Sequence, residues 1–142
     1  MTFNCYSLED TYSVAKRLAK KLNSNSFLAF FGDLGAGKTA FIGALAKALG
    51  YKEQTFSPTF AIVNCYQTEK MPIYHFDMYR VENWEDLYST GYFDYLEQDG
   101  IMAVEWSENI YSALPDERIE IEILRGESDN HRIININGAG EI

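Results

Sequence analysis

Residues 32–39 hold the group of side chains best suited to chemistry in this sequence. They read Gly32-Asp33-Leu34-Gly35-Ala36-Gly37-Lys38-Thr39, which matches the phosphate-binding pattern GxxxxGK[ST] at every fixed position. The glycines permit positive φ values and a close approach of the backbone to a phosphate. Backbone amides at a helix N-terminus face the anion, Lys38 neutralises the β- and γ-phosphates, and the Thr39 hydroxyl binds Mg²⁺. The pattern therefore predicts a nucleotide-binding P-loop.

The segments on either side of this loop have the patterns that it requires. Residues 27–31 are apolar without alternation, which is typical of a strand covered on both faces. Residues 38–49 have inward apolar positions at helical spacing, and Gly50 ends the helix. The loop is thus predicted to lie between a buried strand and an amphipathic helix.

Two carboxylates are candidates to complete a magnesium site and to act in catalysis with Lys38. Asp77 follows the strand-like run 73–76, and Glu105 follows the wholly apolar run 101–104. Either could bind the ion, directly or through water, while the other orients the attacking water. For Asp77, the alternative is that it caps a turn.

The remaining elements complete a mixed sheet. They are a helix over 8–22 capped by Ser7 with Asp10, strands over 59–66 and 73–79, two short helices within 82–97 separated at Gly91, and strands over 119–123 and 131–137. The short polar connection 67–72 predicts an antiparallel hairpin. We therefore expect residues 1–142 to form one α/β domain of the P-loop NTPase-like three-layer type, with a mixed sheet and an antiparallel hairpin insertion.

Composition excludes several classes of function. The net charge of −9 argues against a domain that holds nucleic acid through its general field. The two cysteines form no CxxC pair and have no metal-ligand spacing with the two histidines. Residues 1–22 contain no uninterrupted apolar stretch, so neither a signal peptide nor a membrane span is expected. These features favour a cytoplasmic protein.

The segment Ser57-Pro58-Thr59-Phe60 follows the P-loop helix. A hydroxyl there could reach the γ-phosphate and magnesium, as in the switch loops of P-loop proteins; a proline-containing turn that enters a strand is the alternative. By composition alone, Trp106 and His75 favour packing over function. The sequence has no guanine-reading Asn-Lys-x-Asp motif, so adenine is the favoured base.

Taken together, the motifs resemble those of the bacterial TsaE (YjeE) family. The P-loop, Ser57-Pro-Thr-Phe60, His75-Phe-Asp-Met-Tyr-Arg80 and Glu105-Trp106 occur in that family's order and spacing. The resemblance extends from Ser7 to about Arg132. It implies a P-loop ATPase that binds Mg-ATP and supports threonylcarbamoyladenosine (t6A37) modification of tRNAs that read ANN codons.

The resemblance also implies a role for each site residue. The loop from Asp33 to Thr39, with its Lys38, holds the phosphates. Thr39 and Glu105 hold magnesium, and Asp77 serves the metal or the water. Thr59 belongs to the switch-like segment, Trp106 lies against the site, and Thr11 and Arg132 lie near the nucleotide base. The implied partners are TsaB and TsaD, with tRNA met only through their complex, and with no membrane and no direct DNA binding.

Two other functions stay open from the residues alone. A small-molecule kinase also combines a P-loop with an acidic partner, but it normally needs an arginine-bearing lid, and the arginines at 17, 80, 118, 125 and 132 are scattered. A nucleotide switch without hydrolysis is the second alternative, against which the pair of Asp77 and Glu105 favours hydrolysis. Because no lid and no internal arginine finger stand out in the sequence, we expect a slow ATP hydrolase that depends on its partners.

Overall fold

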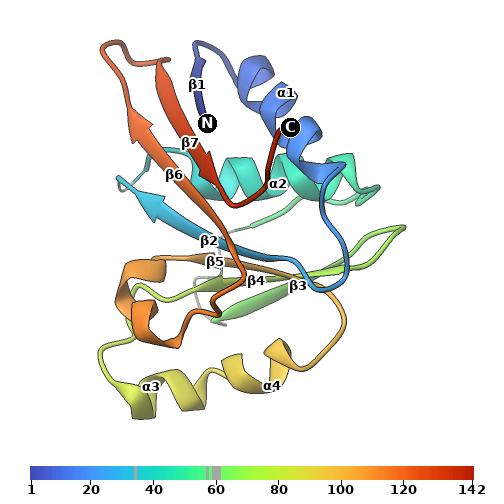
Figure 1. The fold of residues 1–142 in the computed structure, drawn as a ribbon, viewed down its shortest axis with the longest axis vertical. Helices are drawn as coiled ribbons and strands as arrows, with labels where there is room; N and C mark the ends of the chain where they lie inside the picture. The colour runs from blue at the N-terminus through green and yellow to red at the C-terminus, as the bar shows by residue number, and fades with distance from the viewer. Residues whose placement is uncertain (34, 57, 59–61) are drawn as a thin grey trace.

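A mixed sheet divides the molecule into three layers (Figure 1). The computed structural model describes residues 1–33, 35–56, 58 and 62–142, and within them the sheet has seven strands in the order β1-β7-β6-β2-β5-β4-β3. The strands are β1 (Thr2–Cys5), β2 (Phe27–Gly32), β3 (Val63–Gln67), β4 (Pro72–Asp77), β5 (Ile101–Glu105), β6 (Ile119–Arg125) and β7 (Arg132–Asn137). The predicted three-layer α/β class is confirmed.

The strand that leads to the P-loop lies at the centre of the sheet. β2 pairs in parallel with both β5 and β6, and β4 pairs in parallel with β5. Residues 27–30 of β2 are all buried, because helices cover both faces of this central region. The antiparallel pairs lie outside it, including the predicted hairpin of β3 and β4.

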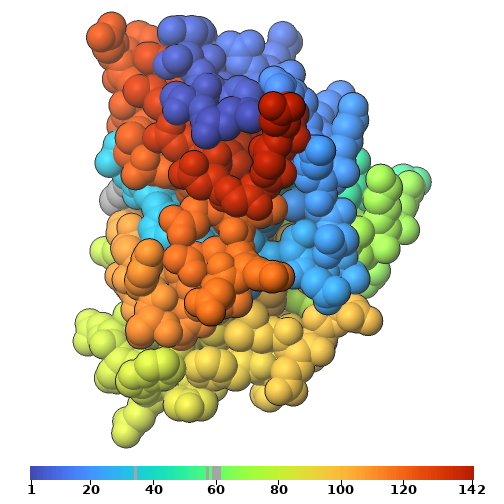
Figure 2. All heavy atoms as spheres, in the orientation of Figure 1, coloured from blue at the N-terminus to red at the C-terminus, as the bar shows by residue number. Residues whose placement is uncertain are grey.

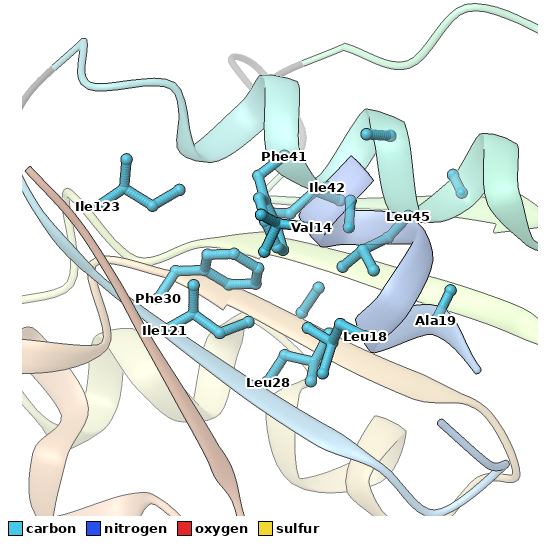
Figure 3. Close-up of a cluster of buried hydrophobic side chains, with 14 of the residues drawn as sticks. Val14, Leu18, Ala19, Leu28, Phe30, Phe41, Ile42, Leu45, Ile121 and Ile123 are labelled. Atoms are coloured by element: carbon cyan, nitrogen blue, oxygen red, sulfur yellow. The ribbon is translucent and has the colours of Figure 1, made fainter. Parts of the chain in front are cut away.

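Two helices, α1 (Leu8–Ala19) and α2 (Lys38–Ala48), cover one face of the sheet. Figure 3 shows Leu18 of α1 and Phe41 of α2 directed toward Leu28 and Phe30 of β2. The predicted cap of α1 is present, since the backbone N–H of Asp10 donates to Ser7 Oγ over 3.1 Å. This apolar layer fixes α2, and therefore the P-loop, against the sheet.

The other face carries α3 (Trp84–Ser89), α4 (Tyr92–Leu96) and the 3₁₀ helix η1 (Ser107–Ala113). Its core is aromatic: Tyr92 is fully buried and meets Phe76 of β4 edge to face, with ring centroids 6.1 Å apart. The predicted break between the two short helices lies at Gly91, which has a φ of 81° and precedes α4.

Two elements differ from the sequence-based expectation. β1 was not expected, because of its four residues only Cys5 is buried; its pairing with β7 across the whole sequence decides its conformation. Figure 2 shows these N-terminal residues (dark blue) beside the C-terminal ones (red). η1 was also not expected, since it is too short to have a helical pattern. No helix in the described part of the chain has the length and apolarity needed to cross a membrane.

Candidate nucleotide-binding site

The candidate site lies where the parallel strands end. β2 ends at Gly32 and runs into the P-loop, while β4 and β5 end side by side at Asp77 and Glu105, which are register partners. Open α/β sheets bind ligands at this carboxyl edge. The fold thus brings the loop and both predicted carboxylates to one edge of the sheet.

The start of the P-loop is held tightly against β6. Gly32 has a φ of 123°, and a Cβ built on it would lie 2.0 Å from the carbonyl oxygen of Ile123. The N–H of Asp33 donates to this same oxygen over 3.3 Å, and the Asp33 carboxylate accepts from the N–H of Arg125 over 3.3 Å. Gly32 is therefore required by close packing, and the Asp33 side chain positions the loop.

The end of the loop faces open space. Gly37 caps α2 with a φ of 109°, and a Cβ built on it would meet nothing within 4 Å. Gly35 also has a positive φ, of 71°. The first amides of α2 have no acceptor within the helix, so they are available to an anion. Leu34 lies outside the described residues.

Lys38 is buried, with 4% of its surface exposed. Its ammonium group donates to the carbonyl oxygen of Gly32 over 3.0 Å and lies 4.4 Å from the ring centroid of Trp106. A buried charge is tolerated where it has such partners. The ammonium is thus held at the loop that it is predicted to serve.

Trp106 reaches Lys38 through a strained backbone. Its φ of 59° and ψ of 42° are left-handed, a conformation that costs a non-glycine residue about 1–2 kcal/mol. Two bonds hold the turn around it: Ser107 Oγ donates to the carbonyl of Val104 over 2.7 Å, and Asn109 Nδ2 donates to that of Met78 over 2.9 Å. Trp106 therefore belongs to the site, contrary to the reading from composition alone.

The hydroxyl of Thr39 donates to Glu105 Oε2 over 2.9 Å. The same oxygen lies 2.5 Å from His75 Nε2, and both His75 and Glu105 are buried. A threonine hydroxyl and a carboxylate are oxygen ligands of the kind Mg²⁺ binds. His75 is packed, as expected, but it also contacts the carboxylate.

Asp77 has the turn-capping contact that was weighed for it from the sequence. Its Oδ1 accepts from the N–H of Tyr79 over 2.9 Å, so it caps the turn after β4. Burial raises the pKa of its carboxyl; the hydrogen bond from Tyr79 opposes this rise, and the charge of Glu105 adds to it. Asp77 is thus a partly buried carboxylate within electrostatic reach of Glu105.

A pocket adjoins the loop on the side of α1 and β7. Its lining includes Ser7, Thr11, Gly37, Ala40, Asp129 and Arg132. Arg132 Nε donates to the carbonyl of Ala36 over 3.0 Å, and Arg125 Nη2 donates to that of Gly35 over 3.4 Å. Thr11 and Arg132, predicted to lie near the base, are thus brought together beside the P-loop.

Some predicted residues lie outside the part of the chain that the structure describes. They are Ser57, Thr59 and Phe60 of the switch-like segment. Sequence reasoning missed Arg125 and Asn109, whose bonds to distant main-chain carbonyls leave no local pattern. It also missed the contact of His75 with the site, although His75 precedes Asp77 by two residues on one strand, a spacing that places both side chains on the same face of the sheet.

We predict that Gly32→Ala and Gly37→Ala differ strongly in stability. Both positions have positive φ, which costs alanine about 1–2 kcal/mol, but only Gly32→Ala forces a Cβ into the Ile123 carbonyl. Gly32→Ala should lose about 2–4 kcal/mol of unfolding free energy. Urea denaturation of both variants provides the measurement, and equal losses would contradict the close packing at Gly32.

We predict that Asp77→Asn stabilises the nucleotide-free protein at neutral pH. Because the folded-state pKa of Asp77 is raised, folding favours the protonated acid, and stability from this residue is lost as pH rises through that pKa. The variant avoids this loss, so its Tm in thermal melts should exceed that of the wild type at pH 7.5. As the pH falls toward about 4, the ordinary pKa of an aspartate, the difference in Tm should vanish. A difference that stays constant with pH would contradict the raised pKa of Asp77.

Known proteins resemble this chain over most of its length. Residues 5–134 match the family model described as threonylcarbamoyl adenosine biosynthesis protein TsaE. The chain is 42% identical over 134 residues to the tRNA threonylcarbamoyladenosine biosynthesis protein TsaE of Aquifex aeolicus, covering 92% of this chain and 90% of that protein. It is 40% identical over 126 residues to the Bacillus subtilis protein of the same name, covering 88% and 78%.

A solved structure gives the same result in three dimensions. The crystal structure of Bacillus subtilis YdiB superimposes with a TM-score of 0.82 at 32% identity, covering 99% of this chain and 86% of that one. Sequence and fold therefore agree with the motifs at the carboxyl edge of the sheet. The chain belongs to the TsaE family, whose proteins take part in the biosynthesis of threonylcarbamoyladenosine in tRNA.

Proposed function

We propose that this protein binds Mg-ATP at the P-loop and hydrolyses it slowly in support of a TsaB–TsaD complex that modifies tRNA. The observation that carries the proposal is the convergence of Lys38 and Thr39, at the start of α2, with Glu105 and Asp77 at the ends of neighbouring strands. These are the parts that P-loop enzymes use to bind a nucleotide and its metal.

The loop supplies the contacts for the phosphates. The ammonium of Lys38 exchanges the Gly32 carbonyl for phosphate oxygens while it stays near Trp106. The free amides at the start of α2 and the open space beside Gly37 favour the close approach of an anion. The hydrogen bonds from Arg125 and Arg132 to loop carbonyls keep this surface in shape.

Thr39 and Glu105 are the residues that would hold magnesium. Among the described residues, no group of three or more His, Cys, Asp or Glu side chains is arranged to hold a metal by itself. This agrees with Mg²⁺, which usually takes one or two protein ligands and completes its shell with phosphates and water. When bound, the ion neutralises charge on the β- and γ-phosphates. Asp77 is the carboxylate left to orient a water.

The pocket lined by Thr11 and Arg132 is the proposed place of the nucleoside. It begins at Gly37, so a nucleotide whose phosphates lie on the loop would extend into it. Adenine is the proposed base, since the sequence lacks the guanine-reading motif.

Membership of the TsaE family supports the partners. With a net charge of −9 the protein is ill suited to hold tRNA by its own field, so TsaB and TsaD are proposed to hold the substrate in the cytoplasm, where tRNA is modified. The arginines beside the loop bind its carbonyls, so a charge for the transition state would come from a partner. Such a residue is worth about 10³–10⁵ in rate.

We predict that Lys38→Ala weakens ATP binding by at least about 10-fold, because a charge-assisted contact to the phosphates is lost. Isothermal calorimetry with ATP and Mg²⁺ measures it. Lys47→Ala is the matched control: this lysine is exposed near the other end of α2 and should leave the affinity unchanged. Wild-type affinity in the Lys38 variant would refute the P-loop proposal.

We predict that the isolated protein hydrolyses ATP well below about 10 s⁻¹, an ordinary enzyme rate, and that TsaB with TsaD raises the rate by about 10³-fold or more, the lower end of what a contributed charge supplies. Steady-state phosphate release measures both. Glu105→Gln should abolish the stimulated rate while ATP still binds. An ordinary rate in isolation that the partners leave unchanged would contradict this division of labour.

A further inference from the structure

A continuous chain of hydrogen bonds leads from the P-loop away from the candidate metal site. Thr39 donates to Glu105 Oε2, which lies 2.5 Å from His75 Nε2. His75 Nδ1 lies 2.8 Å from the hydroxyl of Tyr66, and this hydroxyl donates to the carbonyl oxygen of Phe56 over 2.6 Å. The chain therefore connects the start of α2 with the connection that follows the same helix.

Three adjacent strands supply the middle of this chain. Glu105 ends β5, His75 lies on β4 and Tyr66 lies on β3, at the edge of the sheet (Figure 1). All three residues are buried, with exposed fractions of 5%, 0% and 3%. Water competes little with these hydrogen bonds, so they fix the side chains that they join.

Burying this chain of polar side chains costs desolvation free energy that apolar side chains would avoid. β4 fills its other inward positions with apolar or aromatic side chains such as Ile73 and Phe76. An apolar residue at position 75 would pack there without the cost of desolvating an imidazole beside a carboxylate. His75 instead gives each ring nitrogen one partner, Glu105 on one side and Tyr66 on the other.

The far end of this series of hydrogen bonds holds the main chain of Phe56. The Tyr66 hydroxyl also lies 3.3 Å from the N–H of Phe56, and Asn64 Nδ2 donates to the Phe56 carbonyl over 3.0 Å. Phe56 is 61% exposed, so the contacts of its main chain with β3 are what anchor it. A phenol has one proton and cannot donate to both Phe56 and His75. A change of partner at one end therefore alters the bond at the other.

We propose that His75 and Tyr66 are positioning residues that hold Glu105 for magnesium and couple occupancy of the metal–nucleotide site to residues 51–56, which follow α2. Outer partners of this kind orient ligands in metal sites, and their loss typically costs about 10–100-fold in metal affinity or activity. The inference rests on the proposed function, because it gives Glu105 a metal to bind.

The test compares ATP affinity in Mg²⁺ with ATP affinity in EDTA, by calorimetry. Tyr66→Phe removes one hydroxyl and keeps the ring, and it should reduce the magnesium-dependent gain in affinity about 10-fold while leaving affinity in EDTA unchanged. Tyr74→Phe is the matched control: it removes a buried tyrosine hydroxyl on β4 that bonds Gln98 and Asp99 instead. The control should behave as the wild type does.

Variants of His75 separate positioning from packing. His75→Leu should lose the magnesium-dependent gain, whereas His75→Gln should recover part of it, because its amide can donate to Glu105 from the position of Nε2. In a Glu105→Gln background, Tyr66→Phe should have no further effect, since the residue through which it acts is gone. Additive losses would mean that Tyr66 acts by another route. If His75→Leu does not fold, the proposal is tested by Tyr66→Phe and by the double-mutant cycle of Tyr66→Phe with Glu105→Gln.

Hydrogen exchange tests the coupling itself. Mg-ATP should slow exchange of the amides in residues 51–56 of the wild type and of Tyr74→Phe, but not of Tyr66→Phe. If magnesium raises the ATP affinity of the wild type and that of Tyr66→Phe equally, the positioning role is overturned, and the proposed metal site is not. ATP binding by the wild type that ignores magnesium would overturn the metal site of the proposed function, and this role with it.

Discussion

The burial of the Lys38 ammonium is the constraint on which the rest of the site depends. A cation with 4% exposure needs partners, and here these are the Gly32 carbonyl and the face of Trp106. Trp106 presents that face from a left-handed backbone, and the bonds of Ser107 and Asn109 hold the turn in place. The strained residue next to Glu105 is thus also a partner of the buried lysine.

The two cores fix the carboxylates from opposite sides of the sheet. The face under α1 and α2 is mainly aliphatic, and it holds the P-loop helix. The face under α3 and α4 is rich in aromatic rings: Tyr92 packs against both Phe76 and Phe27, and its hydroxyl donates to the carbonyl of Ala113. Many of the chain's tyrosines and phenylalanines therefore serve to keep β4 and β5 rigid, and so to hold Asp77 and Glu105 at a fixed separation.

The sequence predicted the features that depend on neighbouring residues or on the periodicity of apolar positions. The P-loop, its buried strand and its helix follow from adjacent residues. The two carboxylates could be found because each ends a strand-like run. What it could not predict depends on pairing between distant segments. β1 has no pattern of its own, and the hydrogen bonds of Arg125 and Arg132 to loop carbonyls appear only when β6 and β7 lie beside the loop. For His75, burial was predictable but the carboxylate on the next strand was not.

The pairing of β1 with β7 has a consequence for how the protein is made. Thr2 lies opposite Asn135, and the pocket beside the P-loop draws its walls from Ser7 and Thr11 on one side and from Asp129 and Arg132 on the other. Such contacts have high contact order and must form late, after most of the chain has left the ribosome. The P-loop is synthesised early, but the wall of the pocket beside it is complete only with β7. The proposed nucleotide site is therefore a property of the finished molecule, and a nascent or truncated chain would lack one of its walls.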